Sequence, residues 1–290
     1  MADGLVVVDK PSGWTSHDVV GRCRRLFAQK RVGHAGTLDP GATGVLLVGL
    51  GRATRLLRFV SDLPKSYQGE VVLGLGTSTL DADGEVVARW DMEGVTLEQL
   101  RAAAAGLTGD LLQVPPMVSA LKVGGRRLHQ LARAGVEVER EARPVSVSRF
   151  EVTGWAGTGV ARVQVDCSSG TYVRSLAADL GAAVGGGAHL RALRRTAIGP
   201  FREEEAHPLD ALGLEHVLPM GEAVRHLEPV VVGPAAADAV GHGRPLLRAE
   251  LGHVTGPGPW AVVDHQGALL AVYEAAGEGA RASVVLAPHQ

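Results

Sequence analysis

The chain has 290 residues, of which 46% are hydrophobic and 21% charged, and its formal net charge is -2 at pH 7. This composition provides a sizeable core and excludes a disordered or fibrous chain. The start "MADGLVVVDK" lacks the features of a secretion signal, and no apolar stretch approaches the roughly 20 residues of a membrane span. Because Cys23 and Cys167 also lie far apart, we expect a reduced, cytoplasmic protein without membrane contact.

The N-terminal residues predict a strand and then a helix. The apolar run at 4–10 indicates a strand that ends in a Pro–Gly turn. Segment 15–33 has apolar residues at helical spacing, and Thr15 and Asp18 have the spacing of a capping box. Gly33 is the expected end of this helix.

Helices and strands alternate irregularly in the middle of the chain. Periodicity predicts strands at 44–51, 65–76, 145–152 and 160–169, and helices at 52–60, 96–107 and 171–185. Segment 113–135 is predicted to be broken by prolines and to continue as a basic loop and a short helix. Because several strands follow one another without a helix between them, this order favours a mixed α+β sheet over a doubly wound parallel one.

The composition changes near Pro229. From Pro229 to Gln290 lysine is absent, and five acids outnumber three arginines. Short apolar runs in this part are separated by Gly and Pro. They predict a small β-rich second domain, near the lower size limit for an independent fold.

Three windows of the sequence contain Lys or Arg but no acid, at 19–38, 111–136 and 191–202. In a nearly neutral chain they predict one basic face for a polyanion such as nucleic acid, provided that the fold brings them together. Charge alone equally favours three solvated helix faces.

The stretch "VGHAGTLDPGATG" at 32–44 holds four glycines and a single acid, Asp39, directly before Pro40. Taken alone, an Asp–Pro pair in such a stretch most simply forms a turn. The same loop could present the carboxylate to a substrate, and local chemistry leaves both interpretations open.

Metal and nucleotide motifs do not fit the chain. No P-loop lysine follows the glycines, and Trp90 stands where a calcium loop at 79–90 would need a bidentate Glu. The eleven histidines contain no pair with convincing ligand spacing. We therefore expect no metal site.

Six separated segments carry motifs in one order along the chain: "VDKPSGWTSHDVV", "GHAGTLDPGATGVLLVGLGRATR", "KSYQGEVVLGLGTSTLDADGE", "PPMVSALKVGGRRLHQLARAG", "CSSGTYVRSLAADLG" and "HLRALRRTAIGPF". Together they resemble the motifs of the TruB family of bacterial tRNA pseudouridine-55 synthases, from Gly4 to Phe201. The resemblance implies an α+β, largely antiparallel-sheet catalytic domain at 1–228, with an RNA-gripping insertion near 113–143. It also implies a small β-barrel-like, PUA-like domain at 229–290.

The resemblance assigns three catalytic residues. Asp39 would be the catalytic aspartate, Tyr67 would stack against the target base, and Arg174 would pair with Asp39 and help to seat it. The implied substrate-binding residues are His34 (filling space left by flipped nucleotides), Asp81 (in a polar network), Leu193 (in the base pocket), Lys10 (in a supporting position of the first motif), and Lys122, Arg126 and Arg127 (gripping the RNA).

The implied reaction moves uracil from an N1–C1′ bond to a C5–C1′ bond. It involves no redox step, so we expect no cofactor. It requires a carboxylate that acts as nucleophile, or as base and electrostatic partner. An adjacent arginine should lower the pKa of Asp39 and could hold its carboxylate in bidentate geometry. Because the uracil must leave its stack, the basic windows would hold phosphates, and binding should weaken steeply with salt.

The implied partner is the T arm of tRNA, without an obligatory protein partner, and we expect a monomer. Val118 and His129 depart from the family pattern, which has aromatic residues at these positions, so the RNA contacts of the insertion stay open. Two alternatives are a synthase acting on another RNA and a tRNA-folding chaperone whose chemistry is secondary. The intact "GTLDPGATG" favours catalysis, since a pure binder does not need Asp39.

Overall fold

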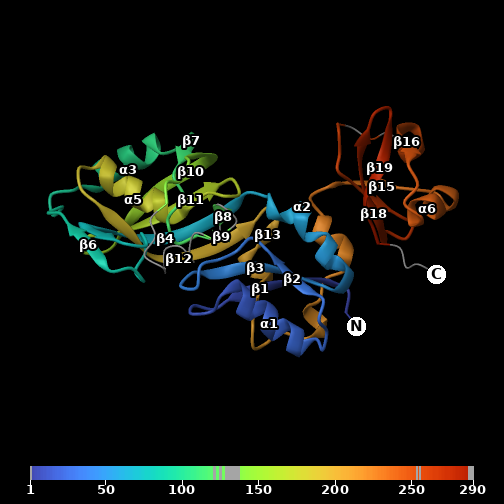
Figure 1. Cartoon of the computed structure of the whole chain (residues 1–290), viewed down its shortest axis with the longest axis horizontal. Coiled ribbons are helices and arrows are strands. Elements are labelled where there is room, and N and C mark those ends of the chain that lie inside the picture. The colour runs from blue at the N-terminus through green and yellow to red at the C-terminus, as the bar shows by residue number, and fades with distance from the viewer. Residues whose placement is uncertain are drawn as a thin grey trace.

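The computed structural model describes residues 2–119, 122–123, 126–127, 138–252, 254 and 256–286. These residues form a ten-stranded sheet, built between Gly4 and Pro208, and a separate five-stranded sheet toward the C-terminus (Figure 1). The predicted mixed α+β class is confirmed. No helix in the described ranges has the length and apolar character needed to cross a membrane.

The large sheet has the order β14-β1-β3-β12-β4-β11-β10-β7, while β2 pairs with β3 and β13 pairs with β12. Only the β1–β14 and β3–β12 pairs in it are parallel among the described strands. Its strands are β1 (Gly4–Lys10), β2 (Val32–Ala35), β3 (Thr43–Leu50), β4 (Lys65–Leu73), β7 (Gly109–Gln113), β10 (Arg143–Gly157), β11 (Val160–Cys167), β12 (Ala188–Ile198), β13 (Phe201–Arg202) and β14 (His207–Pro208).

The described residues also form helices and two small hairpins. The α-helices are α1 (Ser16–Leu26), α2 (Leu57–Ser61), α3 (Leu97–Gly106), α5 (Val173–Ala183) and α6 (Pro234–Gly241). The 3-10 helices are η1 (Gly51–Arg55), η2 (Glu203–Glu205), η3 (Leu214–His216), η4 (Met220–Val224) and η5 (Arg248–Leu251). The hairpins pair β5 (Leu75–Thr77) with β6 (Val86–Arg89), and β8 (Lys122–Val123) with β9 (Arg126–Arg127).

Helix α1 confirms the predicted start but not the predicted end. The Thr15 side chain accepts from the Asp18 amide and the Asp18 side chain accepts in return, which completes the capping box. The helix ends at Leu26, because Val32–Ala35 extends as β2 and pairs with the second half of β3. Gly33 therefore lies within a strand, where its Cβ position is only 3.2 Å from the Leu57 side chain.

No strand is predicted at 188–198, but β12 runs there through the middle of the sheet and joins its two halves. The third basic window lies on this strand and does not form a basic face. Arg191 pairs with Glu70 at 2.6 Å, and Arg194 pairs with Asp9 and Glu203. Glu70 and Asp9 lie 121 and 185 positions from their arginines, and Glu203 lies 9 positions after Arg194 but outside the window. An acid-free window is therefore no measure of local charge in the fold.

One row of paired residues crosses four neighbouring strands. Lys10 pairs with Gly44, Gly44 with Arg195, and Arg195 with Tyr67. Residues directly opposite each other share a face of the sheet, so these positions from β1, β3, β12 and β4 lie side by side on one face.

Helices α1 and α5 cover the same face at opposite ends of this row. Val19 of α1 packs with Val8, which lies two residues before Lys10 on β1. Leu176 of α5 packs with Val71, which lies four residues after Tyr67 on β4. The row therefore lies between the two helices.

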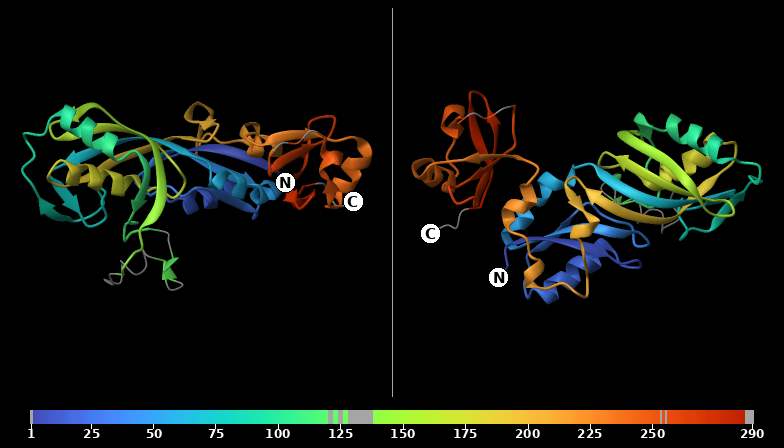
Figure 2. Two further views of the ribbon diagram at one scale, coloured as in Figure 1. Left: turned by 90° about the horizontal axis from the view of Figure 1, so that it is seen from above. Right: turned by 180° about the vertical axis from the view of Figure 1, so that it is seen from behind.

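The C-terminal sheet has the order β15-β17-β18-β19-β16 and packs against α6. Its strands are β15 (Glu228–Val231), β16 (Leu246–Leu247), β17 (Trp260–Val263), β18 (Leu269–Ala276) and β19 (Gly279–Val285). Trp260 and Tyr273 are fully buried in a core of its own, and the views in Figure 2 show the curled sheet beside the larger one.

A continuous apolar cluster joins the two sheets. Val272 from the C-terminal sheet and Leu286, which follows its last strand, pack with Leu5, Leu57 and Val224 from the larger unit. The arginines of η1 and α2 add polar contacts to β19 and its end. Arg52 donates to the carbonyl of Leu286, Arg55 to that of Val285 and Arg58 to that of Ser283.

Candidate active site

Asp39 lies in the connection between β2 and β3. Gly36 opens this loop with a φ of 73°, a conformation that favours glycine. The amide of Ala42 donates to the carbonyl of Asp39 at 3.1 Å and closes a turn around Pro40. The turn interpretation of the Asp–Pro pair is therefore correct, and the turn presents the aspartate.

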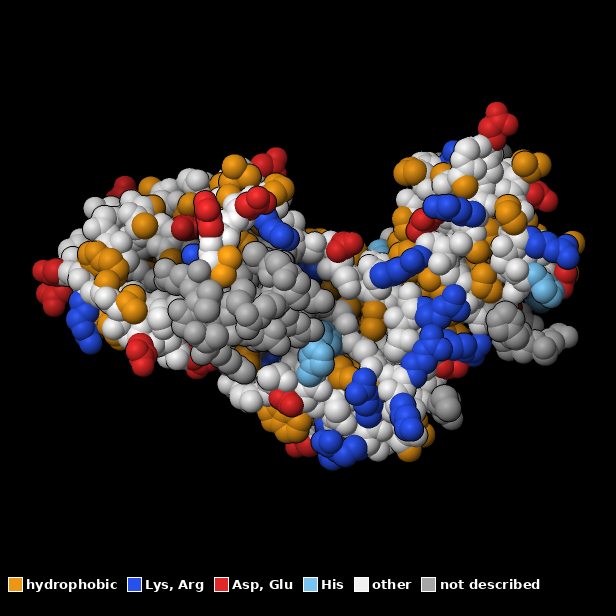
Figure 3. All heavy atoms as spheres, in the orientation of Figure 1, with side chains coloured by type: hydrophobic (Ala, Val, Ile, Leu, Met, Phe, Trp, Pro, Cys, Tyr) orange, Lys and Arg blue, Asp and Glu red, His pale blue; other side chains and the backbone are white. Residues whose placement is uncertain are grey.

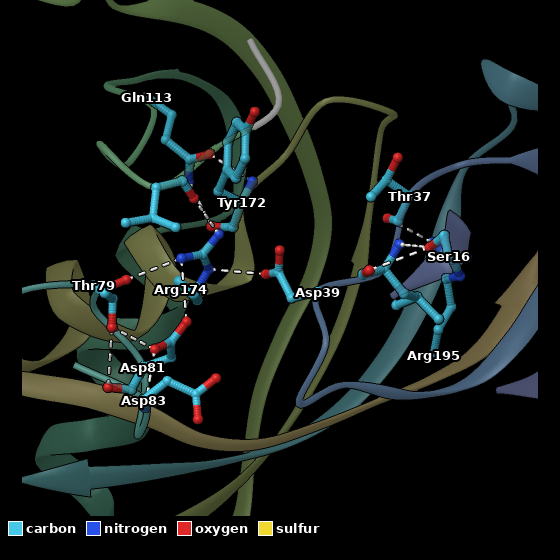
Figure 4. A network of polar contacts seen from close by, with 12 residues as sticks. Ser16, Thr37, Asp39, Thr79, Asp81, Asp83, Gln113, Tyr172, Arg174 and Arg195 are labelled. Atoms are coloured by element: carbon cyan, nitrogen blue, oxygen red, sulfur yellow. Dashed lines mark hydrogen bonds and ion pairs between the residues drawn. The ribbon is translucent and has the colours of Figure 1, made fainter. Parts of the chain in front are cut away.

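Arg174, in the first turn of α5, binds this aspartate (Figure 4). Its Nε lies 2.9 Å from Asp39 Oδ2, and its Nη1 lies 3.2 Å from Asp81 Oδ2. The remaining contacts of the guanidinium are with the carbonyls of Thr79 at 3.0 Å and Val118 at 2.8 Å. The expected bidentate grip on Asp39 is not formed, because the terminal nitrogens bind these other acceptors.

Burial explains why Arg174 needs so many acceptors. Only 4% of its side chain is exposed, and a buried guanidinium is tolerated where its charge and donors are matched. Asp81 is itself held by the Thr79 hydroxyl and by the amide of Asp83. Within the part of the chain that the structure describes, no group of three or more His, Cys, Asp or Glu side chains could hold a metal ion.

The pKa of Asp39 is raised, contrary to the expected lowering. The surrounding protein reduces hydration of the carboxylate, and this effect is larger than the opposing effect of the Arg174 charge. The Asp81 carboxylate also raises the pKa, whereas Lys10 lowers it. Because 44% of the Asp39 side chain is still exposed, the group lies at the surface of a recess and is accessible to a substrate.

Asp39, Tyr67, Arg174 and Leu193 line one pocket of about 320 Å³, together with residues of the loop before α5. This volume is at the lower end of the range of small-ligand sites, roughly 300–1,000 Å³. Tyr67 comes from β4 and Leu193 from β12, so the pocket lies between the helices on the face that carries the row of paired residues. The structure thus brings together the three predicted catalytic residues and one predicted base contact.

The sequence comparisons identify the family. The model for "TruB family pseudouridylate synthase (N terminal domain)" matches residues 24–173, and that for "tRNA pseudouridylate synthase B C-terminal domain" matches residues 174–230. The chain belongs to the TruB family of pseudouridylate synthases.

Individual relatives match nearly the whole chain. A protein of Mycolicibacterium paratuberculosis named "tRNA pseudouridine synthase B" is 47% identical, and the match covers 98% of each chain. One of Thermobifida fusca with the same name is 48% identical over 99% of each chain. A solved H/ACA RNP bound to a substrate RNA containing 2'-deoxyuridine has a chain with a TM-score of 0.76 and 25% identity, and the match covers 98% of this chain and 85% of that one.

The predicted substrate-binding residue His34 of this TruB family member precedes Gly36, which lines the pocket, in the sequence. His34 is on β2, and its ring meets that of His17 edge-on at 5.4 Å. Burial lowers the pKa of His34 to about 4, and electrostatic interactions with His17 and Arg195 act in the same direction. Its Nδ1 has no hydrogen-bond partner among the described residues. The role of His34 in filling space left by flipped nucleotides stays a prediction.

Lys10 differs from the expectation of a substrate-binding residue. It is fully buried, and its ammonium donates to the carbonyls of Pro11, Trp14 and Pro40 at 2.7–3.1 Å. Burial lowers its pKa to about 8. Its direct contact is with the residue after Asp39, so Lys10 supports the loop from beneath.

The predicted RNA-gripping insertion is described only in part. Lys122 pairs with Arg127 in the β8–β9 hairpin, where Arg126 also lies, but these side chains are outside the described structure. His129 is outside the described residues. Basic side chains of the first window, Arg24, Arg25, Lys30 and Arg31, are exposed. Figure 3 shows a band of Lys and Arg side chains running from the α1 region toward the C-terminal sheet.

Sequence reasoning missed two polar side chains that hold the Asp39 loop. The Ser16 hydroxyl accepts from the amide of Leu38 at 3.0 Å and lies 3.3 Å from its carbonyl. Arg195 is 1% exposed and donates to carbonyls at both ends of the loop. In the sequence Ser16 looks like an ordinary residue of the first helical turn, and Arg195 looks like one of several surface arginines.

Proposed function

We propose that this enzyme converts uridine 55 in the T arm of tRNA to pseudouridine, with Asp39 as the catalytic carboxylate. The observation that carries the proposal is the Asp39–Arg174 ion pair at 2.9 Å, at the surface of a pocket that Tyr67 also lines. Family membership supports the isomerisation, and the relatives named "tRNA pseudouridine synthase B" support tRNA as the substrate.

In this proposal the uridine leaves its stack and enters the pocket, where Tyr67 provides an aromatic face in place of the lost stacking. Leu193 contacts the base from β12. The ionised Asp39 carboxylate acts as nucleophile, or as base and electrostatic partner, while the N1–C1′ bond breaks. The uracil turns, C5 bonds to C1′, the C5 proton is lost and N1 is protonated, so atoms and electrons balance without a cofactor.

The proposed assignment of Arg174 is to hold Asp39 in position and in its ionised form. The raised pKa of Asp39 places its titration above that of an ordinary aspartate, and the arginine limits this rise. We assign Asp81 an indirect role: its carboxylate binds Nη1 of Arg174 and so helps to hold the arginine that positions Asp39.

The RNA would be held outside the pocket by basic side chains. The exposed arginines of α1 and the insertion that includes Lys122, Arg126 and Arg127 are the proposed contacts with T-arm phosphates. His34 is proposed to fill space that flipped nucleotides leave. We further propose that the enzyme works in the cytoplasm as a monomer without an obligatory protein partner, in two domains divided near residue 228.

The test is release of tritium from tRNA that carries [5-³H]uridine, with the modified position mapped. Wild-type protein should release one equivalent per tRNA from position 55, and Asp39→Asn should release none while still binding tRNA. A wild-type protein that leaves the T-arm uridine unmodified would contradict the function. A fully active Asp39→Asn would contradict the site alone.

A further inference from the structure

Arg195 occupies the centre of the row that crosses the sheet beneath the pocket. It lies between Gly44 on β3 and Tyr67 on β4. Its side chain is 1% exposed, among the most buried of the large side chains in the described structure. No carboxylate pairs with it in the described ranges, in contrast to its neighbour Arg194, which pairs with Asp9 and Glu203.

The guanidinium of Arg195 instead binds backbone at both ends of the Asp39 loop. Nη2 donates to the carbonyl of Gly36 at 2.8 Å, and Nη1 lies 3.5 Å from that of Thr37. Nε donates to the carbonyl of Val45 at 2.7 Å. One rigid group therefore fixes the distance between the end of β2 and the start of β3, between which Asp39 is held.

Two glycines make this reach possible. A Cβ on Gly44 would lie 2.2 Å from the carbonyl oxygen of Arg195, so β3 and β12 approach this closely only with glycine there. Gly36 has a φ of 73°, and its Cβ position is 3.5 Å from Nη1 of Arg195. At Gly44 the two backbones approach too closely for a side chain, and at Gly36 the positive φ is the reason for glycine.

Arg195 also contacts the predicted stacking residue. Burial raises the pKa of Tyr67, and the nearby Arg195 side chain opposes this rise. The two residues pair across β12 and β4 and line the same pocket. Resting on the proposed function, we infer that Arg195 is a positioning residue that couples the Asp39 loop to Tyr67, so that the carboxylate and the aromatic face keep a fixed geometry around the uridine.

Only an arginine meets these contacts together. The planar guanidinium presents five donors in a fixed fork, whereas lysine presents three donors from one atom. Lysine would keep the charge and lose the simultaneous contacts with Val45, Gly36 and Tyr67. Displacement of a reacting group by about 1 Å can cost roughly 100-fold in rate, so Arg195→Lys should lower the rate of the chemical step by about 10- to 100-fold.

The experiment measures single-turnover conversion of T-arm RNA at saturating enzyme, and RNA affinity separately. Arg195→Lys should lower the single-turnover rate and leave the Kd for RNA within about twofold. The control is Arg225→Met, which removes an arginine that pairs with Glu205 and donates to the carbonyl of Pro200, away from the pocket. It should lower the thermal midpoint and leave the single-turnover rate unchanged.

Coupling to Tyr67 is tested by a double-mutant cycle with Tyr67→Phe, which keeps the ring and removes the hydroxyl. Arg195→Lys should cost less in the Tyr67→Phe background than in the wild type. Backbone amide exchange at 36–38 should become faster in Tyr67→Phe, a variant that leaves the buried arginine intact and so does not depend on how Arg195→Lys folds.

Three results would overturn the inference: an unchanged single-turnover rate in folded Arg195→Lys, a loss that lies wholly in Kd, or additive effects in the cycle together with unchanged amide exchange. Wild-type activity separates this inference from the proposed function. An inactive wild-type enzyme refutes the function, whereas an active one with any of these three results refutes the role of Arg195 alone.

Discussion

Replacement of Arg174 by Met tests the electrostatics of the site most directly. The change keeps an unbranched apolar stem and removes the charge that lies between Asp39 and Asp81. Removing one partner of a buried ion pair costs about 3–5 kcal/mol, because the other charge is left buried and unpaired.

The solvent exposure of the three side chains indicates where in this range of about 3–5 kcal/mol the stability loss of Arg174→Met should lie. The Arg174 side chain is 4% exposed, but Asp39 is 44% and Asp81 21% exposed, so water partly replaces the arginine at the carboxylates. This argues for the lower end, about 3 kcal/mol. The carbonyls of Thr79 and Val118 also lose a donor. We expect a loss of about 3–4 kcal/mol in the free energy of unfolding at pH 7.

Urea denaturation as a function of pH measures this loss and its origin. Without Arg174 the pKa of Asp39 should rise further, because the arginine charge is what lowers it. Protonation then removes the unpaired charge, so wild type and variant should converge in stability as the pH falls through the titration of Asp39. Adding Asp81→Asn to Arg174→Met should recover about 1 kcal/mol or more.

Activity provides an independent readout of the same charge. The acid limb of kcat/KM in the wild type should lie above the ordinary aspartate range, and any residual activity of Arg174→Met should show this limb at a still higher pH. A stability loss below about 1 kcal/mol, or a larger loss that does not change with pH, would refute the view that Arg174 neutralises the two carboxylates.

Three further predictions follow from the same structure. Truncation after residue 228 should lower the thermal midpoint of the remaining domain as well as its RNA affinity, because the cluster around Leu5 loses its C-terminal cover; an unchanged midpoint would show that this cover is dispensable. The folded-state pKa of Lys10 is lowered to about 8 from an ordinary 10.5, so wild-type stability should gain from this group as the pH rises from 8 to 10.5, and Lys10→Met should lack that gain in urea titrations. Replacing Arg126 and Arg127 together by Ala should weaken tRNA binding and reduce the salt dependence of log K by about one per lost phosphate contact, and equal slopes for wild type and variant would exclude these side chains from the interface.

Local sequence features were sufficient for several elements of this protein. The capping box predicted at Thr15–Asp18 forms, and the helix predicted from Thr96 begins with a capping box to Gln99, because a cap depends on residues within one helical turn. Apolar runs likewise predicted β1, β3 and β4 and, in the C-terminal sheet, β17, β18 and β19. The six co-linear motifs predicted the family, which the comparisons confirm.

Elements that depend on partners distant in the chain were missed. The predicted helix extends to Gly33 and so overlaps the first half of β2, which is a strand because it pairs with β3. β12 carries arginines on both faces, so its sequence lacks the alternation of apolar and polar residues that predicts a strand. Its charges are matched by Glu70, Asp9 and Glu203.

The sequence by itself determined that a single aspartate lies in a glycine-rich turn within a recognisable set of motifs. The tertiary structure decided how that aspartate is held. In the folded chain, Arg174 uses a terminal nitrogen to bind Asp81 and makes no second bond to Asp39. Burial raises the pKa of Asp39, and Arg195 lies beneath the loop. The physical reason is that hydration and ion pairing depend on which residues meet across the sheet, and strand pairing brings together residues more than 100 positions apart.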